Sequence, residues 1–283
     1  MHGTLNLIRR YILCLPALII LIFFFAAPIF QIFIMSFHPY KGPMEVGEKF
    51  TFENYISIFT RSYLVNCIIR TIRIAACSSI VAVIMAYPLS YYIAKATSSI
   101  RRKILLFTIF FCFFNSTIGR GLSWYLILGS KGIINLILTS LGMQEIRILH
   151  SELAVEIGLV YVILPFAVLS IVPSIQKIDP SLRESALILG ANEFKTFIHV
   201  TLPLSLPGIS AALSTCLAIT LAAFVIPMIL GGGLVDMLSN IIYIRMKAVL
   251  NFALGGALSF VLLAASLITM YVIILPLRKV KWT

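Results

Sequence analysis

Side chains that could carry out catalysis are few and scattered along this chain. Glu152 and Glu156 fall one turn apart near an expected helix start, where they favour the helix dipole rather than general acid–base chemistry. The Gly231–Gly233 run lacks the Gly-Lys-Ser/Thr ending of a nucleotide-binding loop. The chain has four histidines, and none of them stands at metal-ligand spacing from another: His2, His38, His150 and His199. We therefore expect no catalytic residue, no metal site and no cofactor bound by this chain.

A polar segment at residues 181–203 interrupts an otherwise apolar sequence and carries a set of local structure signals. Asp179-Pro180 is expected to stop the preceding helix, because proline disfavours helical geometry in the residue before it. Ser181 and Glu184 match the S-x-x-E capping box, which predicts a short helix beginning at Leu182. That helix is expected to run to about Leu189.

Gly190 offers the left-handed conformation that ends a helix without a side-chain penalty. Asn192 is placed to cap a second short helix, and Pro203 and Pro207 are expected to mark its end and the entry to the next apolar run. Two short helices that meet at a glycine form a compact projection with apolar residues on one side. Such a projection favours docking to a partner, and an ordinary connecting loop is the alternative.

The elements that hold this segment are expected to be membrane spans. The chain is 60% hydrophobic and 11% charged, and its charges fall in clusters between long uncharged runs. We predict an all-α membrane protein, one transmembrane domain over 1–283, with six spans near 12–36, 71–94, 104–129, 154–173, 204–230 and 254–276. The first span is too long for a cleavable signal peptide and is expected to be retained.

Lysines and arginines beside the span ends predict the orientation. The short 95–103 loop holds Lys95, Arg101, Arg102 and Lys103 and no acid. Positive residues are denser on the side that includes both chain ends and the 181–203 segment, so both termini and that segment are predicted to be cytoplasmic. The net charge of +12 suits anionic lipid headgroups better than nucleic acid.

A short helix is also predicted on the outer side, where Thr51 precedes Phe52, Tyr55, Ile56 and Phe59 at helical spacing. Either the helix lies on the membrane surface or it offers a docking surface to an external partner.

The 181–203 segment resembles the cytoplasmic signature of ABC importer permeases, Glu-Ala-Ala-x3-Gly-x9-Ile-x-Leu-Pro. The matching positions are Glu184, Ser185, Ala186, Gly190, Val200, Leu202 and Pro203, with Ser185 and Val200 replacing the usual alanine and isoleucine. The resemblance implies the type I permease fold, with this segment seated in a cleft of the ATPase subunit. It also implies two ABC ATPase subunits that use ATP and Mg, a second permease, similar or identical, and an external solute-binding protein.

Further segments are similar to the permease branch associated with spermidine and putrescine import, whose members also carry opine-like compounds and aminoethylphosphonate. They include Arg120-x3-Trp124 and the Phe224-Val225-Ile226-Pro227 run, which make Arg120, Trp124, Phe224 and Pro227 candidates for the substrate path. The branch's usual acid before Phe224 is Ala223 here, so we expect no carboxylate at mid-span to attract a polycation.

Arg120 leaves two interpretations open. An arginine within a span is a functional candidate and, if it faced the path, would favour an anionic or zwitterionic ligand. Alternatively, its side chain extends to the outer membrane interface beside Trp124. The sequence favours an inner-membrane importer subunit; a stand-alone channel or a membrane-embedded enzyme, which would need clustered acids, histidines or a polar span, is the alternative.

Overall fold

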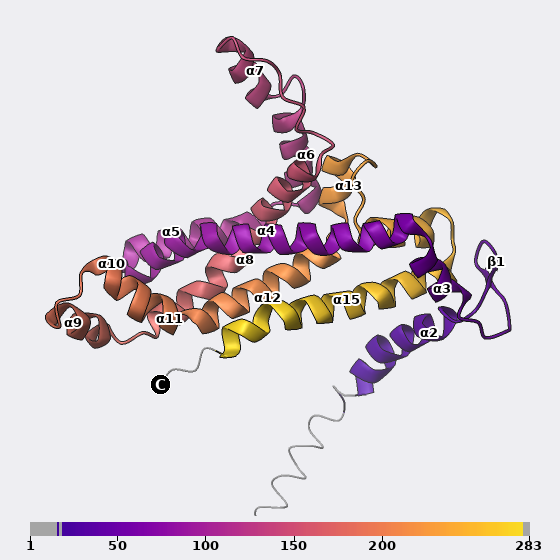
Figure 1. Ribbon diagram of the computed structural model, residues 1–283, viewed down its shortest axis with the longest axis horizontal. Helices are drawn as coiled ribbons and strands as arrows, with labels where there is room; N and C mark the ends of the chain where they lie inside the picture. The colour runs from indigo at the N-terminus through magenta and orange to yellow at the C-terminus, as the bar shows by residue number, and fades with distance from the viewer. Residues whose placement is uncertain (1–15, 17–18, 280–283) are drawn as a thin grey trace, which may run out of the picture. The chain divides into compact units, whose positions relative to one another are not determined.

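The computed structural model describes residue 16 and residues 19–279, and its main elements are helices (Figure 1). The chain divides into two compact units, which are described separately. Unit 1 comprises the residues up to Val65 together with Ile241–Val261, and unit 2 comprises Asn66–Asn240 and the residues from Leu262 onward. Helices α4 (Ser62–Lys95), α14 (Leu238–Tyr243) and α15 (Phe252–Lys279) run across this division.

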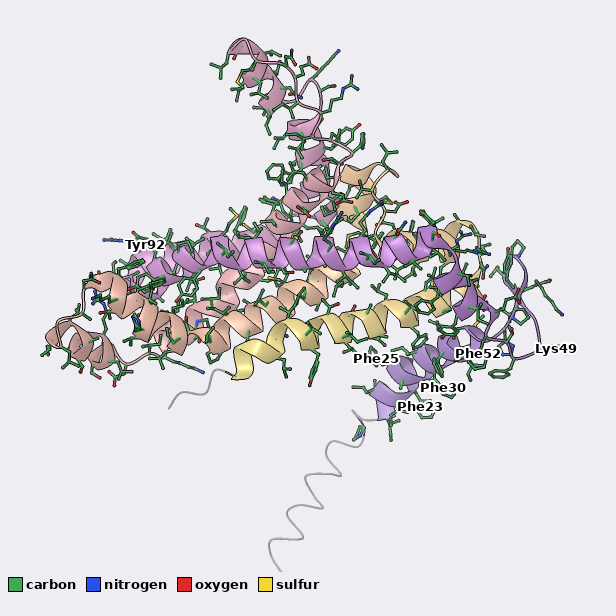
Figure 2. All side chains as sticks on the ribbon, viewed as in Figure 1. Phe23, Phe25, Phe30, Lys49, Phe52 and Tyr92 are labelled. Carbon is green, nitrogen blue, oxygen red and sulfur yellow. The ribbon has the colours of Figure 1, made fainter. Side chains whose placement is uncertain are left out.

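In unit 1, the first described helix is apolar over Ile19–Met35 and includes the π-helical turn η1 (Ile22–Ala26) and α2 (Ala27–Met35). Phe23, Phe25 and Phe30 project from it and are largely exposed, as a lipid-facing surface would be (Figure 2). Its other side packs on the start of α15, where the rings of Phe33 and Phe260 meet edge to face at 4.9 Å. The predicted span 12–36 begins outside the described residues.

Unit 1 also holds the two-stranded hairpin β1 (Tyr40–Gly42) and β2 (Glu45–Val46), the helix α3 (Glu53–Thr60) and the π-helical turn η4 (Ile244–Ala248). The N-cap of α3 is Phe52, one residue after Thr51, which was predicted to cap this helix; the Thr51 hydroxyl accepts the Glu53 N–H at 3.1 Å. Asn54 fixes α3 by donating to the carbonyls of Ser36 and His38 at 2.9 and 2.8 Å. The predicted apolar face stays largely exposed.

Unit 2 is built around α4, α8 (Glu152–Gln176) and α12 (Leu206–Ala222), which supply most of its buried apolar side chains. Helix α12 packs closely on α8, because a Cβ placed on Gly208 would lie 2.4 Å from the Cβ of Ser174. The remaining elements of unit 2 are α5 (Ser99–Phe111), the 3₁₀ turn η2 (Cys112–Phe114), α6 (Thr117–Leu128), α7 (Ile133–Ser140), α9 (Pro180–Ile188), α10 (Glu193–Thr196), the π-helical turn η3 (Phe197–Thr201), α11 (Leu202–Leu204) and α13 (Val225–Gly231).

The expectation of one unbroken helix over 104–129 is wrong. The chain leaves helical geometry at Asn115 and Ser116, between η2 and α6. Neither glycine nor proline marks this break, and apolar residues continue on both sides of it, so hydrophobicity alone gave no sign of it.

The helix predicted over 204–230 is interrupted as well, since α12 ends at Ala222 and α13 begins at Val225. Two polar side chains satisfy the backbone carbonyls that this break frees: the Ser239 hydroxyl donates to Ala223 O at 2.6 Å, and the Asn240 amide donates to Phe224 O at 2.8 Å. Backbone without helical hydrogen bonds is tolerated at membrane depth only with such partners.

Among the described residues, four helical segments are long and apolar enough to cross a membrane, and a bent pair brings the number to five. The four are Ser62–Lys95, Thr117–Ser140, Glu152–Gln176 and Phe252–Leu275, and the bent pair is Glu193–Leu204 with Leu206–Ala222. The chain is therefore a multi-pass membrane protein.

Candidate functional site

The first helix of the 181–203 segment begins two residues earlier than predicted. Asp179 is the N-cap of α9 and accepts the Ser181 N–H at 2.9 Å, and Pro180 occupies the first helical position. The predicted capping box of Ser181 and Glu184 is wrong, because proline is preorganised for the first helical position and Asp179 is a strong capping residue. The backbone hydrogen bond from Ser181 also lowers the pKa of Asp179 below its ordinary value.

Gly190 ends α9 in the left-handed conformation, with φ of +84°. The Ala191 N–H donates to Ala186 O and the Gly190 N–H donates to Leu187 O, both at 3.0 Å. These two bonds form the Schellman motif, which satisfies carbonyls at the helix end and requires a positive φ at the glycine position. The predicted glycine turn is confirmed.

The second helix begins where the sequence predicts, since the Asn192 side chain accepts the Lys195 N–H at 2.8 Å. It continues through η3 and α11 to Leu204, so it ends between Pro203 and Pro207 as predicted. The wide turn η3 ends two residues before Pro203, which has no N–H for an ordinary helical bond. The helix axis bends by 60° at Ser205, directly before α12 begins at Leu206.

An ion pair joins the two short helices across the glycine turn. The Arg183 guanidinium donates to Glu193 Oε1 at 2.5 Å. This hydrogen bond raises the pKa of Arg183 above its ordinary value. Because both side chains are partly exposed, the pair orients α9 against α10 more than it stabilises the fold.

Two contacts fasten the end of the 181–203 segment to the span α4. The Tyr87 hydroxyl lies 2.8 Å from the Ser205 hydroxyl, at the bend. The Phe197 ring meets the rings of Tyr87 and Tyr91 edge to face at 5.7 and 5.8 Å. A displacement of the helical stretch Glu193–Leu204 would therefore act on α4 as well as on α12.

Three large apolar side chains of the segment are exposed among polar neighbours. Ile188, Leu189 and Phe194 are 85%, 86% and 69% exposed, and α9 has no buried residue. Six of the seven residues that match the permease signature are predicted to couple to an ATPase, and they fall into two groups. Glu184, Ser185 and Gly190 are exposed and Ala186 is half-buried, whereas Leu202 and Pro203 are half-buried near the bend. The first group can meet a partner, and the second can pass on its movement.

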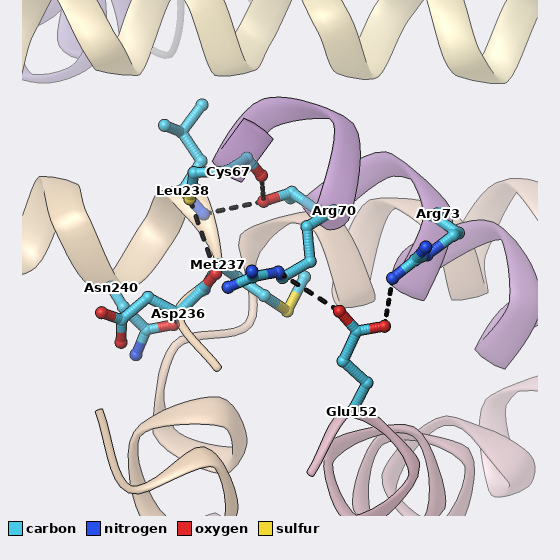
Figure 3. A network of polar contacts seen from close by, with 9 residues as sticks. Cys67, Arg70, Arg73, Glu152, Asp236, Met237, Leu238 and Asn240 are labelled. Carbon is cyan, nitrogen blue, oxygen red and sulfur yellow. Dashed lines mark hydrogen bonds and ion pairs between the residues drawn. The ribbon is translucent and has the colours of Figure 1, made fainter. Parts of the chain in front are cut away.

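At the opposite end of α4, a polar network fixes the start of α8 (Figure 3). Arg70 Nε lies 3.3 Å from Glu152 Oε1, and Arg73 is hydrogen-bonded to the other oxygen of the same carboxylate. Nearby, the Thr71 hydroxyl accepts the Leu238 N–H at 2.8 Å. Glu152 thus sits at the helix N-terminus as predicted, but its two arginine partners were not foreseen.

A cavity of about 370 Å³ lies between α4, α6 and α8. Of the four residues predicted for the substrate path, only Trp124 lines it; the Trp124 ring meets the Tyr161 ring edge to face at 5.8 Å. Phe224 lies at the break before α13, and Pro227 is buried within α13. Glu156 and Ser78 are also among its lining residues. The sequence placed Glu156 at a helix start and gave no sign of Ser78.

Arg120 is 8% exposed and does not line the cavity. Its Nε and terminal nitrogen donate to Asn115 O at 3.1 and 2.7 Å. The guanidinium therefore satisfies the carbonyl at the break between η2 and α6. The predicted extension of this side chain to the membrane interface is not what the structure shows.

The sequence and the fold of the chain were compared with those of known proteins. No protein-family model matches the chain. The spermidine/putrescine transport system permease PotB of Haemophilus influenzae is 34% identical over 255 residues, 89% of this chain and 88% of that protein. PotB of Escherichia coli is 31% identical over 247 residues, 86% of this chain and 88% of that protein.

Solved structures agree on the fold. A bacterial ABC transporter involved in import of the acidic polysaccharide alginate matches with a TM-score of 0.79 at 18% identity, covering 100% of both chains. The same kind of transporter in complex with a periplasmic protein that binds an alginate pentasaccharide matches with a TM-score of 0.74 at 18% identity, covering 93% of this chain and 91% of that one. The chain belongs to the family of ABC importer permeases that includes the spermidine/putrescine permease PotB.

Proposed function

We propose that this chain is a six-span permease subunit of the inner membrane, with both termini cytoplasmic, in an importer of polyamines such as spermidine or putrescine or of a related amino compound. It works with a second permease, with two ATPase subunits that use ATP and Mg, and with an external binding protein that delivers the solute. The 181–203 segment receives the movement of the ATPase.

The observation that carries the coupling role is the exposed apolar surface of Ile188, Leu189 and Phe194 on two capped helices. Exposed apolar side chains rimmed by polar residues indicate an interaction site. Behind this surface, the bend at Ser205 and the bond to Tyr87 connect the segment to two spans at once. A capped projection that joins two spans and exposes apolar side chains suits the transfer of movement from a motor.

The proposed orientation is supported by the arrangement within unit 2. Phe197 of the 181–203 segment contacts Tyr87 and Tyr91 near the end of α4, while Arg70 and Arg73 near its start contact Glu152. The positive 95–103 loop follows the end of α4, so the two regions predicted to be cytoplasmic lie at one end of that helix.

The polyamine class is supported by the names of the PotB relatives. The alginate importer matches at only 18% identity and supports the fold alone.

Reconstitution tests the proposal. The chain would be purified with its partner permease and ATPase and placed in liposomes, and uptake of labelled putrescine would be measured with ATP and the loaded binding protein. We expect uptake that requires all components, and we expect that Leu189→Asp abolishes it, with Leu141→Asp, an equally apolar exposed position after α7, as the matched control. Equal uptake by both variants would contradict the coupling role.

A further inference from the structure

The connection between α4 and α5 concentrates positive charge. It holds the basic cluster, which comprises Lys95, Arg101, Arg102 and Lys103, and residues 95–103 include no acid. Lys95 is the last residue of α4, and the other three lie within the first turns of α5. Arg102 is half-buried, and the side chains of the other three are exposed. Four cations are therefore gathered at one end of α4.

The basic cluster has no counter-charge in the part of the chain that the structure describes. There, ion pairs join Arg70 and Arg73 to Glu152, and Arg183 to Glu193, and none of them includes a cation of the cluster. Neighbouring cations repel one another, and those at the start of α5 also oppose the helix dipole. A negatively charged partner would offset both effects.

The same helix carries an exposed apolar face that begins at the basic cluster. Ile100, Ile104 and Phe107 recur at helical spacing and are 70%, 59% and 66% exposed. On the other side of α5, Leu105 and Leu106 pack against the buried core of unit 2. In a multi-pass membrane protein, an exposed apolar face opposite a packed one is covered by lipid. The cations of α5 therefore lie at the edge of the lipid-facing surface, where headgroups meet hydrocarbon.

Tyr92 marks the same level independently on α4. It lies one turn before Lys95 and is 54% exposed, whereas the ring of its neighbour Tyr91 packs on Phe197 inside the protein (Figure 2). Tyrosine is enriched where hydrocarbon meets headgroups, because its ring is apolar and its hydroxyl group is polar. Both helices thus place the basic cluster at the depth of the lipid headgroups.

We propose that the basic cluster binds the phosphate groups of anionic phospholipids. Four cations directly beside a span match the charge of such headgroups, and arginine can bind two phosphate oxygens at once. The acyl chains of the same lipids would cover Ile104 and Phe107. Bound lipid would hold the end of α4 that Phe197 of the 181–203 segment contacts. The inference goes beyond the proposed function and does not depend on which solute is carried.

An acidic surface of the ATPase is the competing occupant, because the 181–203 segment contacts the same end of α4. Lipid fits the surroundings better. Acidic residues of a water-soluble subunit would pair with the cations but would leave the apolar face that starts at Ile100 uncovered. The ATPase therefore becomes an outcome of the test.

Fluorescence quenching measures lipid binding beside the basic cluster without transport. A bimane label would be attached at Ile104→Cys, next to Lys103, in the assembled transporter whose chain lacks its five native cysteines. The complex would be placed in nanodiscs that contain phosphatidylglycerol or phosphatidylcholine with brominated acyl chains. Because bromine quenches on contact, the ratio of the two quenching curves gives the relative affinity of the two lipids for this position.

The test variant is the triple substitution Arg101→Gln, Arg102→Gln and Lys103→Gln. Its matched control removes three exposed cations elsewhere, with Lys41→Gln, Lys49→Gln and Lys131→Gln. A second variant, Arg101→Lys with Arg102→Lys, keeps the charge of the cluster and changes only its geometry.

We expect phosphatidylglycerol to bind beside the label about tenfold more tightly than phosphatidylcholine, with a preference that weakens in high salt. The triple variant should lose the preference, whereas the matched control and the lysine variant should keep most of it. Equal quenching by the two lipids in the unsubstituted cluster, or a preference that survives the triple substitution, would overturn the proposal.

Dissociation of the ATPase from the triple variant, with the lipid preference unchanged, would also overturn the proposal and would assign the cluster to the ATPase. A clear lipid preference in a transporter that fails to import any diamine would contradict the proposed solute and leave the lipid site standing.

Discussion

The Arg183 guanidinium binds the Glu193 carboxylate at 2.5 Å and so joins α9 to α10 across the turn at Gly190. The pair links residues ten positions apart in the part of the chain expected to meet the ATPase. Variants of the pair can separate its effect on the orientation of α9 against α10 from its small contribution to the free energy of unfolding.

Reversal of this ion pair is the first test. Arg183→Glu alone should place two acids side by side and reduce ATP-driven uptake several-fold. The free energy of unfolding of the complex should change by less than about 1 kcal/mol, because the pair is partly exposed. The double variant Arg183→Glu with Glu193→Arg should recover most of the uptake. A double variant no better than the single one would show that the pair does not orient the two helices.

Gly190 provides a sharper test of the turn itself. A residue with a Cβ in the left-handed region costs about 1–2 kcal/mol, and a β-branched side chain costs more. Gly190→Val should therefore disrupt the Schellman motif and uncouple ATP hydrolysis from uptake, while membrane insertion remains normal.

Gly142→Val is the matched control for Gly190, because Gly142 also has a positive φ of +74° and open space around its Cα. We expect it to keep uptake near the wild-type level. Full transport by Gly190→Val would contradict the coupling role of the turn.

Asp179 gives a dependence on pH with a defined sign. The pKa of Asp179 is lowered in the folded protein, so its contribution to the stability of α9 is present above the ordinary aspartate pKa and is lost as pH falls through the lowered value. Asp179→Ala should increase hydrogen exchange of the α9 amides at neutral pH. Asp179→Asn, which can cap without a charge, should keep the protection and remove its loss at low pH.

Equal exchange in Asp179→Ala and the wild type would mean that the cap is not formed in the assembled transporter.

Arg120 is expected to act on stability rather than on substrate affinity. Arg120→Met leaves the Asn115 carbonyl without its two donors and should lower the free energy of unfolding by about 2 kcal/mol. Arg120→Lys should lose less. The measurement is thermal unfolding of the purified complex together with the KM for uptake; a raised KM with unchanged stability would instead place Arg120 on the substrate path.

The local features of the 181–203 segment could be predicted because they depend on neighbouring residues. The Gly190 turn and the Asn192 cap follow from backbone geometry over a few positions. The start of α9 was misplaced because two capping candidates, Asp179 and Ser181, stand two residues apart. Pro180 decides between them, since its fixed φ suits the first helical position.

Features that depend on distant residues could not be predicted. The break after Ala222 is satisfied by Ser239 and Asn240, which lie 16 positions away from the carbonyls they bind. The pairing of Glu152 with Arg70 and Arg73 likewise depends on α4 as the neighbour of α8. Hydrophobic periodicity carries no information about such partners.

The central claim, that the 181–203 segment receives the movement of the ATPase, is tested most directly by cross-linking. Cysteine would be placed at Leu189, which is 86% exposed, in a variant without its five native cysteines, and the assembled transporter would be treated with a short bifunctional maleimide. We predict a cross-link to the ATPase subunit whose yield changes between the nucleotide-free and ATP-bound states. A Leu189→Cys chain that forms no cross-link to the ATPase in either state, in a transporter that still hydrolyses ATP and imports its solute, would contradict the account.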